Sequence, residues 1–170
     1  MVLPLVSAPS NTVTYASHNI TFVGVTGPVN GLCTWTYYVC SGGGRVVHAI
    51  SHWDLESCVG TTNEWPIEWG TDPNQGGSIE YGTDQHTGIT GIKFDVGMDD
   101  YECATFWFKV KECTVGQKEV GIKSGQNIYT GSYLPGPSHE TTAPEFGSLA
   151  IPATIASLAV AGALIAGRKK

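Results

Sequence analysis

The sequence contains few charged residues and no basic cluster before its last three positions. Only 14% of its 170 residues are charged, against about 25% in an average soluble domain, and none of them precedes Arg45. The formal net charge is −6; without Arg168, Lys169 and Lys170, six basic residues oppose fifteen acidic ones, which gives −9. Because phosphate contacts require a surface rich in Lys and Arg, this distribution argues against a nucleic-acid partner.

A helical apolar pattern is also missing between Asn11 and Pro137. Short runs rich in Thr, Val, Ile and aromatic residues alternate there with Gly, Pro, Asn and Asp. This pattern predicts an all-β protein, and the spacing of the runs favours a β-sandwich or jelly-roll-like ectodomain over residues 11–137. The predicted strands are Thr12–Tyr15, Ile20–Val25, Cys33–Cys40, Val46–Trp53, Ser78–Tyr81, Thr90–Val96, Ala104–Lys111, Lys118–Lys123 and Asn127–Tyr133.

The run Ala104–Lys111 shows the clearest alternation of apolar and polar residues. Its even-numbered residues are apolar, whereas its odd-numbered residues, which include Trp107, are mostly polar. Alternation with a period of two predicts one buried and one wetter face. Trp107 on the wetter face is either covered by a loop or part of a recognition surface.

The C-terminal part differs sharply from this body. Residues 147–167 are 21 consecutive residues without a charge, and Arg168, Lys169 and Lys170 follow them. A helix needs roughly 20 apolar residues to cross a bilayer, so this segment predicts a single transmembrane helix. The positive-inside rule places the basic end, 168–170, in the cytoplasm and the acidic body outside the cell. The alternative is a buried helix that ends a soluble domain.

A polar linker, residues 138–146, ends in Pro144, Glu145 and Phe146, and Gly147 opens the apolar segment. This order of Pro-Glu-Phe, apolar segment and basic end resembles the PEF-CTERM (PEFG-type) sorting signals of archaeal surface proteins. The resemblance covers about the last 27 residues. It implies that an archaeosortase-type processing enzyme recognises the motif, cuts near it and transfers the body to a lipid anchor.

The body itself offers a fainter resemblance. The segments Tyr81–Asp84, Thr87–Asp95 and Gly121–Lys123 look like those of uncharacterised secreted β-domains that carry sorting tails. Such domains imply no chemistry for this chain.

The N-terminal residues 1–10 are apolar and contain a small-residue site at Val6, Ser7 and Ala8. They lack the basic region of a complete signal peptide, and their apolar run is short. We interpret them as the remnant of a signal peptide that begins upstream, with an apolar first strand as the alternative.

The five cysteines contain no Cys-x-x-Cys pair, which argues against a zinc ribbon or attached haem. They are Cys33, Cys40, Cys58, Cys103 and Cys113. Disulfides are expected in an exported chain, and an odd number leaves at least one free thiol. Cys103 and Cys113 lie at the two ends of one predicted strand, about 30 Å apart at roughly 3.3 Å per residue, so they cannot bond each other. The bonds must therefore join different strands, and Cys40–Cys58 is one candidate pair.

The segment Ser51-His52-Trp53-Asp54 contains the residue types of a catalytic triad. Neighbours on a strand point to alternating faces, whereas triad members converge from separate elements, so the segment predicts no catalytic site. His48 and His52 share a strand parity and can reach one face, but a metal site there needs further ligands. The chain is therefore predicted not to be an enzyme, with an exported hydrolase as a minor alternative.

Two acidic loops are candidates for calcium, the only cofactor that the sequence suggests. The first contains Asp72 and Asn74, and the second contains Asp99 and Asp100. The first loop departs from the EF-hand pattern, because its twelfth position is Thr83 rather than Glu. Turn-capping side chains are the alternative explanation.

Three aromatic residues, Trp65, Trp69 and Tyr81, are candidates for stacking on sugar rings, with Glu64 and Glu68 beside them to bind hydroxyl groups. Closing the core is the alternative role for such aromatics. A sequon at Asn19-Ile20-Thr21 predicts an N-glycan at Asn19, at the edge of a strand.

These features together predict an exported cell-surface glycoprotein, anchored by its C-terminal segment to the membrane or to a lipid. Its β-domain is expected to be non-catalytic and to serve adhesion, envelope structure or contact with other surface proteins. A carbohydrate-binding surface module is the alternative.

Overall fold

The structure is a computed structural model that describes residues 10–44, 48–58 and 62–139. These residues form ten β-strands and no helix. The strands are β1 (Thr12–Tyr15), β2 (His18–Val29), β3 (Leu32–Cys40), β4 (Ile50–Glu56), β5 (Glu68–Asp72), β6 (Ser78–Thr83), β7 (Thr90–Asp95), β8 (Cys103–Val110), β9 (Val115–Ser124) and β10 (Asn127–Pro137). The all-β prediction is therefore confirmed.

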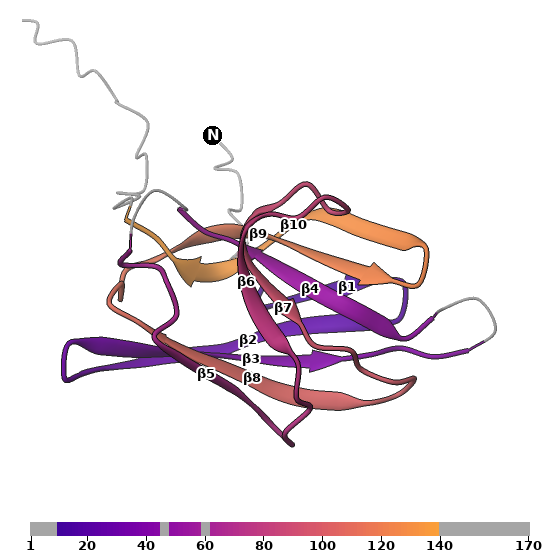
Figure 1. Cartoon of the computed structure of the whole chain (residues 1–170), viewed down its shortest axis with the longest axis horizontal. Helices are drawn as coiled ribbons and strands as arrows, with labels where there is room; N and C mark the ends of the chain where they lie inside the picture. The colour runs from indigo at the N-terminus through magenta and orange to yellow at the C-terminus, as the bar shows by residue number, and fades with distance from the viewer. Residues whose placement is uncertain (1–9, 45–47, 59–61, 140–170) are drawn as a thin grey trace, which may run out of the picture.

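Two antiparallel five-stranded sheets face each other as a sandwich (Figure 1). The first sheet has the order β1-β2-β3-β8-β5, and the second has the order β10-β9-β4-β7-β6. The chain passes from one sheet to the other between β3 and β4, β4 and β5, β5 and β6, β7 and β8, and β8 and β9. Because the two sheets are built alternately in this way, each inner face is covered by strands distant in the sequence.

An aromatic core fills the space between the sheets. From the first sheet, Tyr37 of β3 and Phe106 of β8 contact Trp53, which lies on β4 of the second sheet. Their ring centroids are 5.6 and 5.4 Å from that of Trp53, respectively. Trp53 stacks on Phe94 of β7 at 4.2 Å, and all four side chains are fully buried. The Tyr37 hydroxyl donates to the Pro135 carbonyl on the second sheet, so its one polar atom is paired, as burial requires.

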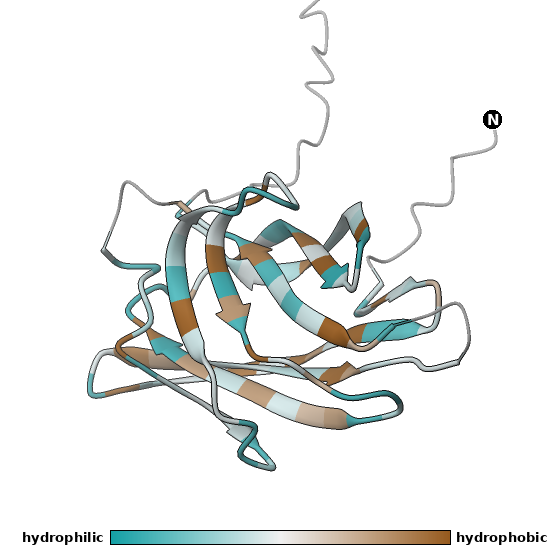
Figure 2. Cartoon of the chain, turned by 45° about the vertical axis from the view of Figure 1, so that its right-hand side comes forward, coloured by the Kyte–Doolittle hydropathy of each residue, from teal (hydrophilic) through white to brown (hydrophobic). Residues whose placement is uncertain are grey.

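Hydropathy alternates along the strands, as Figure 2 shows by the change between brown and teal. The prediction for Ala104–Lys111 is confirmed, because the even-numbered residues of β8 are buried and the odd-numbered ones are partly exposed. Trp107 lies on the outer face of the first sheet. A Cβ atom on Gly70 of β5 would come within 2.7 Å of the Trp107 ring, so the indole lies over this glycine.

One strand of the structure was not predicted, one predicted strand is displaced, and most of the others differ from the prediction only in where they begin or end. β5 was not predicted, because Glu-Trp-Gly-Thr-Asp combines a glycine with acidic ends; it forms by pairing at the sheet edge with β8 alone. The strand predicted at Val46–Trp53 instead runs from Ile50 to Glu56. The strand continues past Trp53 because Leu55 also points into the core. The residues that alternate with these two, His52 and Asp54, are polar.

Two disulfides fasten the ends of the β3–β8 pair. Cys40 and Cys103 face each other directly in the ladder, with Cα atoms 4.1 Å apart. Cys33, at the other end of β3, is bonded to Cys113, with Cα atoms 5.5 Å apart. Both bonds join separate segments, as predicted, but the candidate pair Cys40–Cys58 is wrong: Cys58 is exposed and has a free thiol. The two disulfides fit an oxidising, extracellular environment.

No helix within the described ranges is long and apolar enough to span a membrane. The predicted transmembrane segment 147–167, the basic end 168–170, the sorting motif 144–147 and nearly all of the predicted signal remnant 1–10 lie outside the described residues.

The disulfides generate a prediction for stability. Their loops span 63 and 80 residues, for which the chain-entropy model gives about 4 kcal/mol each. We expect the double variant Cys40→Ser/Cys103→Ser to lose about 2–5 kcal/mol of unfolding free energy in urea denaturation. Cys58→Ser, which breaks no bond, is the matched control and should change stability by less than about 0.5 kcal/mol. Equal stability of the double variant and the control would contradict the pairing.

Candidate functional site

The outer face of the second sheet carries a buried polar cluster. His52 and Asp54 alternate along β4 with Trp53 and Leu55, which point into the core, so both polar side chains point outward. Their exposures are nevertheless only 4% and 2%. A polar pair on an outer face is this well buried only when another part of the chain covers it.

The cover is the loop between β6 and β7, residues 84–89. The backbone closes on itself, because Asp84 N–H donates to the Ile89 carbonyl and Gly88 N–H donates to the Asp84 carbonyl. Ile89 is buried at 6% exposure. Gly121 of β9, which pairs with Asp54, makes room for this loop: a Cβ atom there would lie 2.8 Å from Ile89 Cδ1 and 3.2 Å from Thr87 Cγ2.

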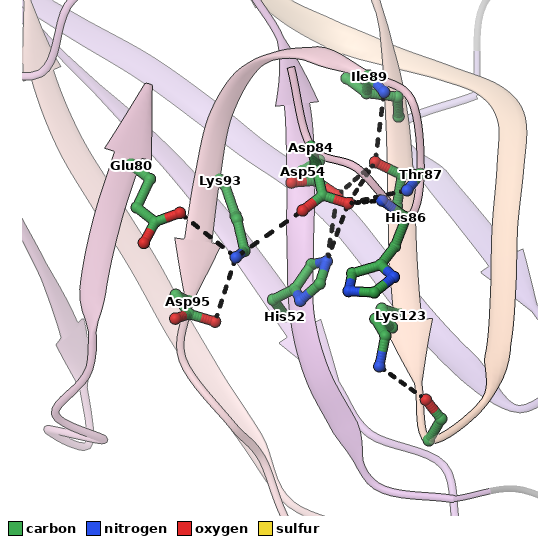
Figure 3. A network of polar contacts seen from close by, with 11 residues as sticks. His52, Asp54, Glu80, Asp84, His86, Thr87, Ile89, Lys93, Asp95 and Lys123 are labelled. Atoms are coloured by element: carbon green, nitrogen blue, oxygen red, sulfur yellow. Dashed lines mark hydrogen bonds and ion pairs between the residues drawn. The ribbon is translucent and has the colours of Figure 1, made fainter. Parts of the chain in front are cut away.

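Three potential ligand atoms converge beneath the loop. His52 Nε2 lies 3.7 Å from Asp54 Oδ2 and 3.5 Å from Asp84 Oδ1, and the three groups offer ligand atoms within 4.8 Å of one another. Figure 3 shows them pointing toward a common centre, with His86 of the loop beside His52. The rings of these two histidines are 5.9 Å apart.

Hydrogen bonds hold the two carboxylates in place. Asp84 Oδ1 accepts the backbone N–H groups of His86 and Thr87, each at 2.8 Å. The Thr87 hydroxyl donates to Asp54 Oδ2 at 2.8 Å. Within the described part of the chain, however, His52 Nε2 and Asp54 Oδ1 are buried without a hydrogen-bond partner.

Lys93 of β7 is the cation of the cluster. Its Nζ lies 3.4 Å from Glu80, 3.7 Å from Asp95 and 3.8 Å from Asp84 Oδ2. It thus faces the Asp84 oxygen that is turned away from His52 (Figure 3). A pocket of about 260 Å³ beside it is lined by residues of β6 and the loop, including Glu80, Asp84 and Gln85.

The environment separates the pKa values of the two aspartates. Burial raises the pKa of Asp54 to about 7, and the charge of Asp84 adds to this effect. Burial also acts to raise the pKa of Asp84, but the Thr87 and His86 N–H groups and the charge of His52 outweigh it and lower that pKa. Burial lowers the pKa of His52, which favours its uncharged imidazole. The pKa values of the two aspartates are thus shifted in opposite directions.

Separated carboxyl pKa values are also found in acid–base catalysis. A catalytic group, however, must reach a reacting atom of the substrate. His52 and Asp54 are almost completely covered by the loop, so this arrangement suits the binding of a small ion better than chemistry on an external substrate.

A second polar pocket, of about 350 Å³, lies where the described chain ends. Glu64 is fully buried there; it accepts the Cys58 backbone N–H at 2.6 Å and lies 3.6 Å from the His139 ring. His139 also contacts Glu112 at 2.7 Å. Ser138 and His139, predicted as the start of a polar linker, therefore pack against the sandwich.

The candidates for calcium lie in two loops that a side-chain contact connects. The Asn74 side chain accepts the Gly76 N–H in a local turn, which matches the turn-capping alternative. Gln75 joins the two acidic loops through Glu102. Among the described residues, Asp72, Asp99 and Asp100 belong to no group of three converging ligands.

The predicted sugar-stacking residues are only partly brought together. Trp65 and Tyr81 have ring centroids 5.1 Å apart, whereas Trp69 lies on β5 of the other sheet, and both Trp69 and Tyr81 pack against the core. The acids predicted beside them have other partners, since Glu64 is buried and Glu68 pairs with Lys109 at 2.6 Å. Two further aromatic side chains share the outer face of the first sheet: Trp107, which is partly exposed, and Tyr38, which is 43% exposed.

Asn19 and His48 also differ from their predicted positions. Asn19 lies within β2, which has β1 and β3 on either side, and its Oδ1 accepts the Thr14 hydroxyl. Its glycosylation remains a prediction. His48 precedes β4 and lies against Gly125, so the shared strand parity of His48 and His52 was wrong.

Sequence reasoning identified His52 but not its partners. The alternation of a strand could have identified Asp54 as a partner, because His52 and Asp54 are two residues apart on β4 and therefore share a face. Asp84 carried no such signal, because only the fold brings its loop over β4.

Comparison of the chain with protein-family models, curated proteins and solved structures gives no match.

The loop packing generates a prediction at Gly121. A methyl group there would meet Ile89, Thr87 and the Tyr129 carbonyl, with distances of 2.8–3.2 Å. We expect Gly121→Ala to lower the unfolding free energy by about 1–3 kcal/mol, the usual cost of overpacking, as measured by thermal and urea denaturation. Gly97→Ala is the matched control, because its new methyl group has only an ordinary contact at 3.8 Å. If both variants had the same stability, the close packing of the loop on β9 would be refuted.

Proposed function

We propose that this chain is an exported cell-surface protein whose β-sandwich is held at the membrane, directly or through a lipid, by its C-terminal segment. The observation that carries the proposal is the pair of disulfides across β3 and β8, since such bonds persist in oxidising compartments. The charge distribution and the order of motif, apolar segment and basic end in residues 144–170 support it.

The sandwich serves contact rather than catalysis in this proposal. Asp54, whose pKa is raised to about 7, is buried under the loop 84–89 and shielded from large substrates. Adhesion, envelope structure or contact with neighbouring surface proteins are the roles that fit such a domain. An archaeosortase-type enzyme is the proposed processing partner, through Pro144, Glu145 and Phe146.

The sorting step can be tested on the full chain in an archaeal host that has an archaeosortase, with an export signal supplied upstream. We expect the mature wild-type protein to lack residues C-terminal to the motif and to carry a lipid mass. Replacement of Pro144, Glu145 and Phe146 by Ala should retain the tail, as shown by intact-mass spectrometry of the membrane fraction. The matched control, Thr141→Ala/Thr142→Ala, alters the same linker outside the motif. Identical masses for the motif variant and the control would refute recognition of the motif.

A second candidate function, carbohydrate binding, is favoured by the outer face of the first sheet. In the β3–β8 ladder, Trp107 pairs with Thr36 and Tyr38 pairs with Thr105. The two aromatic residues therefore occupy diagonal positions on adjacent strands. The Trp107 ring packs against Gly70, and Lys109 Nζ lies 5.7 Å from the ring centroid, so the proposed sugar contact uses the part of the indole that these groups leave open.

This alternative predicts that the full chain binds oligosaccharides on an array of hexoses and N-acetylhexosamines. Trp107→Ala should weaken binding about two- to tenfold, which corresponds to the roughly 0.5–1.5 kcal/mol of a ring-stacking contact. Tyr133→Ala, which removes an exposed ring on the second sheet, is the control and should leave binding unchanged. Absence of binding by the wild type would eliminate this function.

A further inference from the structure

We propose that His52, Asp54 and Asp84 form a binding site for a divalent transition-metal ion of the zinc class. The proposal concerns the outer face of the second sheet and is independent of how the chain is sorted or anchored. It rests on the geometry of the ligand atoms, on buried polar atoms without partners and on the charges around them.

The spacing of the ligand atoms fits a tetrahedral ion. Zinc binds imidazole nitrogen and carboxylate oxygen at roughly 2.0–2.2 Å, so two of its ligands lie about 3.4 Å apart. The distances from His52 Nε2 to Asp84 Oδ1 and Asp54 Oδ2 are 3.5 and 3.7 Å. The ligand atoms of Asp54 and Asp84 lie within 4.8 Å of each other, so sharing one ion requires the two carboxylates to approach by at most about 1.4 Å.

Within the described residues, His52 Nε2 at this centre has no hydrogen-bond partner, and neither has Asp54 Oδ1, the other oxygen of the Asp54 ligand group. Their side chains are 5% and 2% exposed. A buried polar atom without a partner is unfavourable, and native structures usually satisfy it with protein, water or an ion. A cation is suited to this position because both atoms can act as electron-pair donors.

The surrounding groups supply the second shell that a metal site requires. Backbone N–H groups of the loop orient Asp84, and the Thr87 hydroxyl orients Asp54. Lys93 faces the distal oxygen of Asp84 rather than the centre, and Glu80 and Asp95 balance its charge. The exposed His86 beside His52 offers a fourth ligand from the loop.

The ligand types select the class of ion. Calcium and magnesium prefer sets made only of oxygen ligands, six or more in number. One imidazole with two carboxylates instead suits zinc and its neighbours in the first transition series. Competition between ions is therefore part of the test.

In the experiment, the full chain is first made metal-free with a chelator, the chelator is removed, and Zn²⁺ is then titrated into the protein. Cys58→Ser serves as the background, so that the free thiol cannot bind metal. Calorimetry should give one ion per chain, and Zn²⁺ should raise the melting temperature, since a ligand of the folded state stabilises it. Ca²⁺ and Mg²⁺ at the same concentration should produce neither effect.

Two variants remove ligands with little change in shape. In Asp84→Asn the amide oxygen still accepts the loop N–H groups, so the loop remains folded. We expect Asp84→Asn and His52→Gln each to weaken Zn²⁺ binding by at least ~10–100-fold, the loss that even second-shell changes cause. The matched controls, Asp100→Asn and His48→Gln, alter exposed residues of the same types outside the ligand set and its second shell and should bind as the background protein does.

A measurement on the background protein itself covers the case in which a variant misfolds. Zn²⁺ should shift the imidazole nitrogen resonances of His52 and leave those of His48 in place. The proposal is overturned if no saturable binding occurs, if a buried water satisfies the centre at all Zn²⁺ concentrations, or if the ligand variants and controls lose equal affinity.

Discussion

The pairing of β3 with β8 is the constraint on which the rest of the structure depends. Its ladder runs from Cys33 opposite Val110 to Cys40 opposite Cys103, with disulfides fastening both ends. This pair presents the aromatic side chains on which the second sheet packs. Because successive side chains of a strand point to opposite faces, burying Trp53 in that core directs its neighbours His52 and Asp54 to the outer face of the second sheet.

The loop over that face is held mainly by polar contacts. Only Ile89 supplies a buried apolar side chain, whereas Asp84, Thr87 and the loop backbone form most of the hydrogen bonds. Burying carboxylates and an imidazole costs free energy unless they are paired. The position of the loop is therefore coupled to the state of the groups beneath it, which a purely apolar cover would not be.

Much of the fold could be predicted from local patterns, because alternation and turn residues mark strands directly. β5 escaped prediction because Gly70 has no side chain of its own to signal a strand and makes room for Trp107, a contact that depends on the neighbouring strand. Disulfide partners were equally hidden, since Cys40 and Cys103 meet through a strand register that no local pattern encodes. The same limit applied to the polar cluster: parity relates His52 to Asp54, but only tertiary packing brings Asp84 to them.

The four edge strands determine whether neighbouring copies of this domain can pair through their sheets. An open edge offers unpaired backbone groups to another molecule, and proteins block it with short strands, prolines or bulges. β1, β5 and β6 have only 4, 5 and 6 residues. β10 is longer, with 11 residues, but it carries Pro135 and Pro137 and a register shift after Tyr129. The sandwich can thus be packed at high density without its sheets joining into a continuous aggregate.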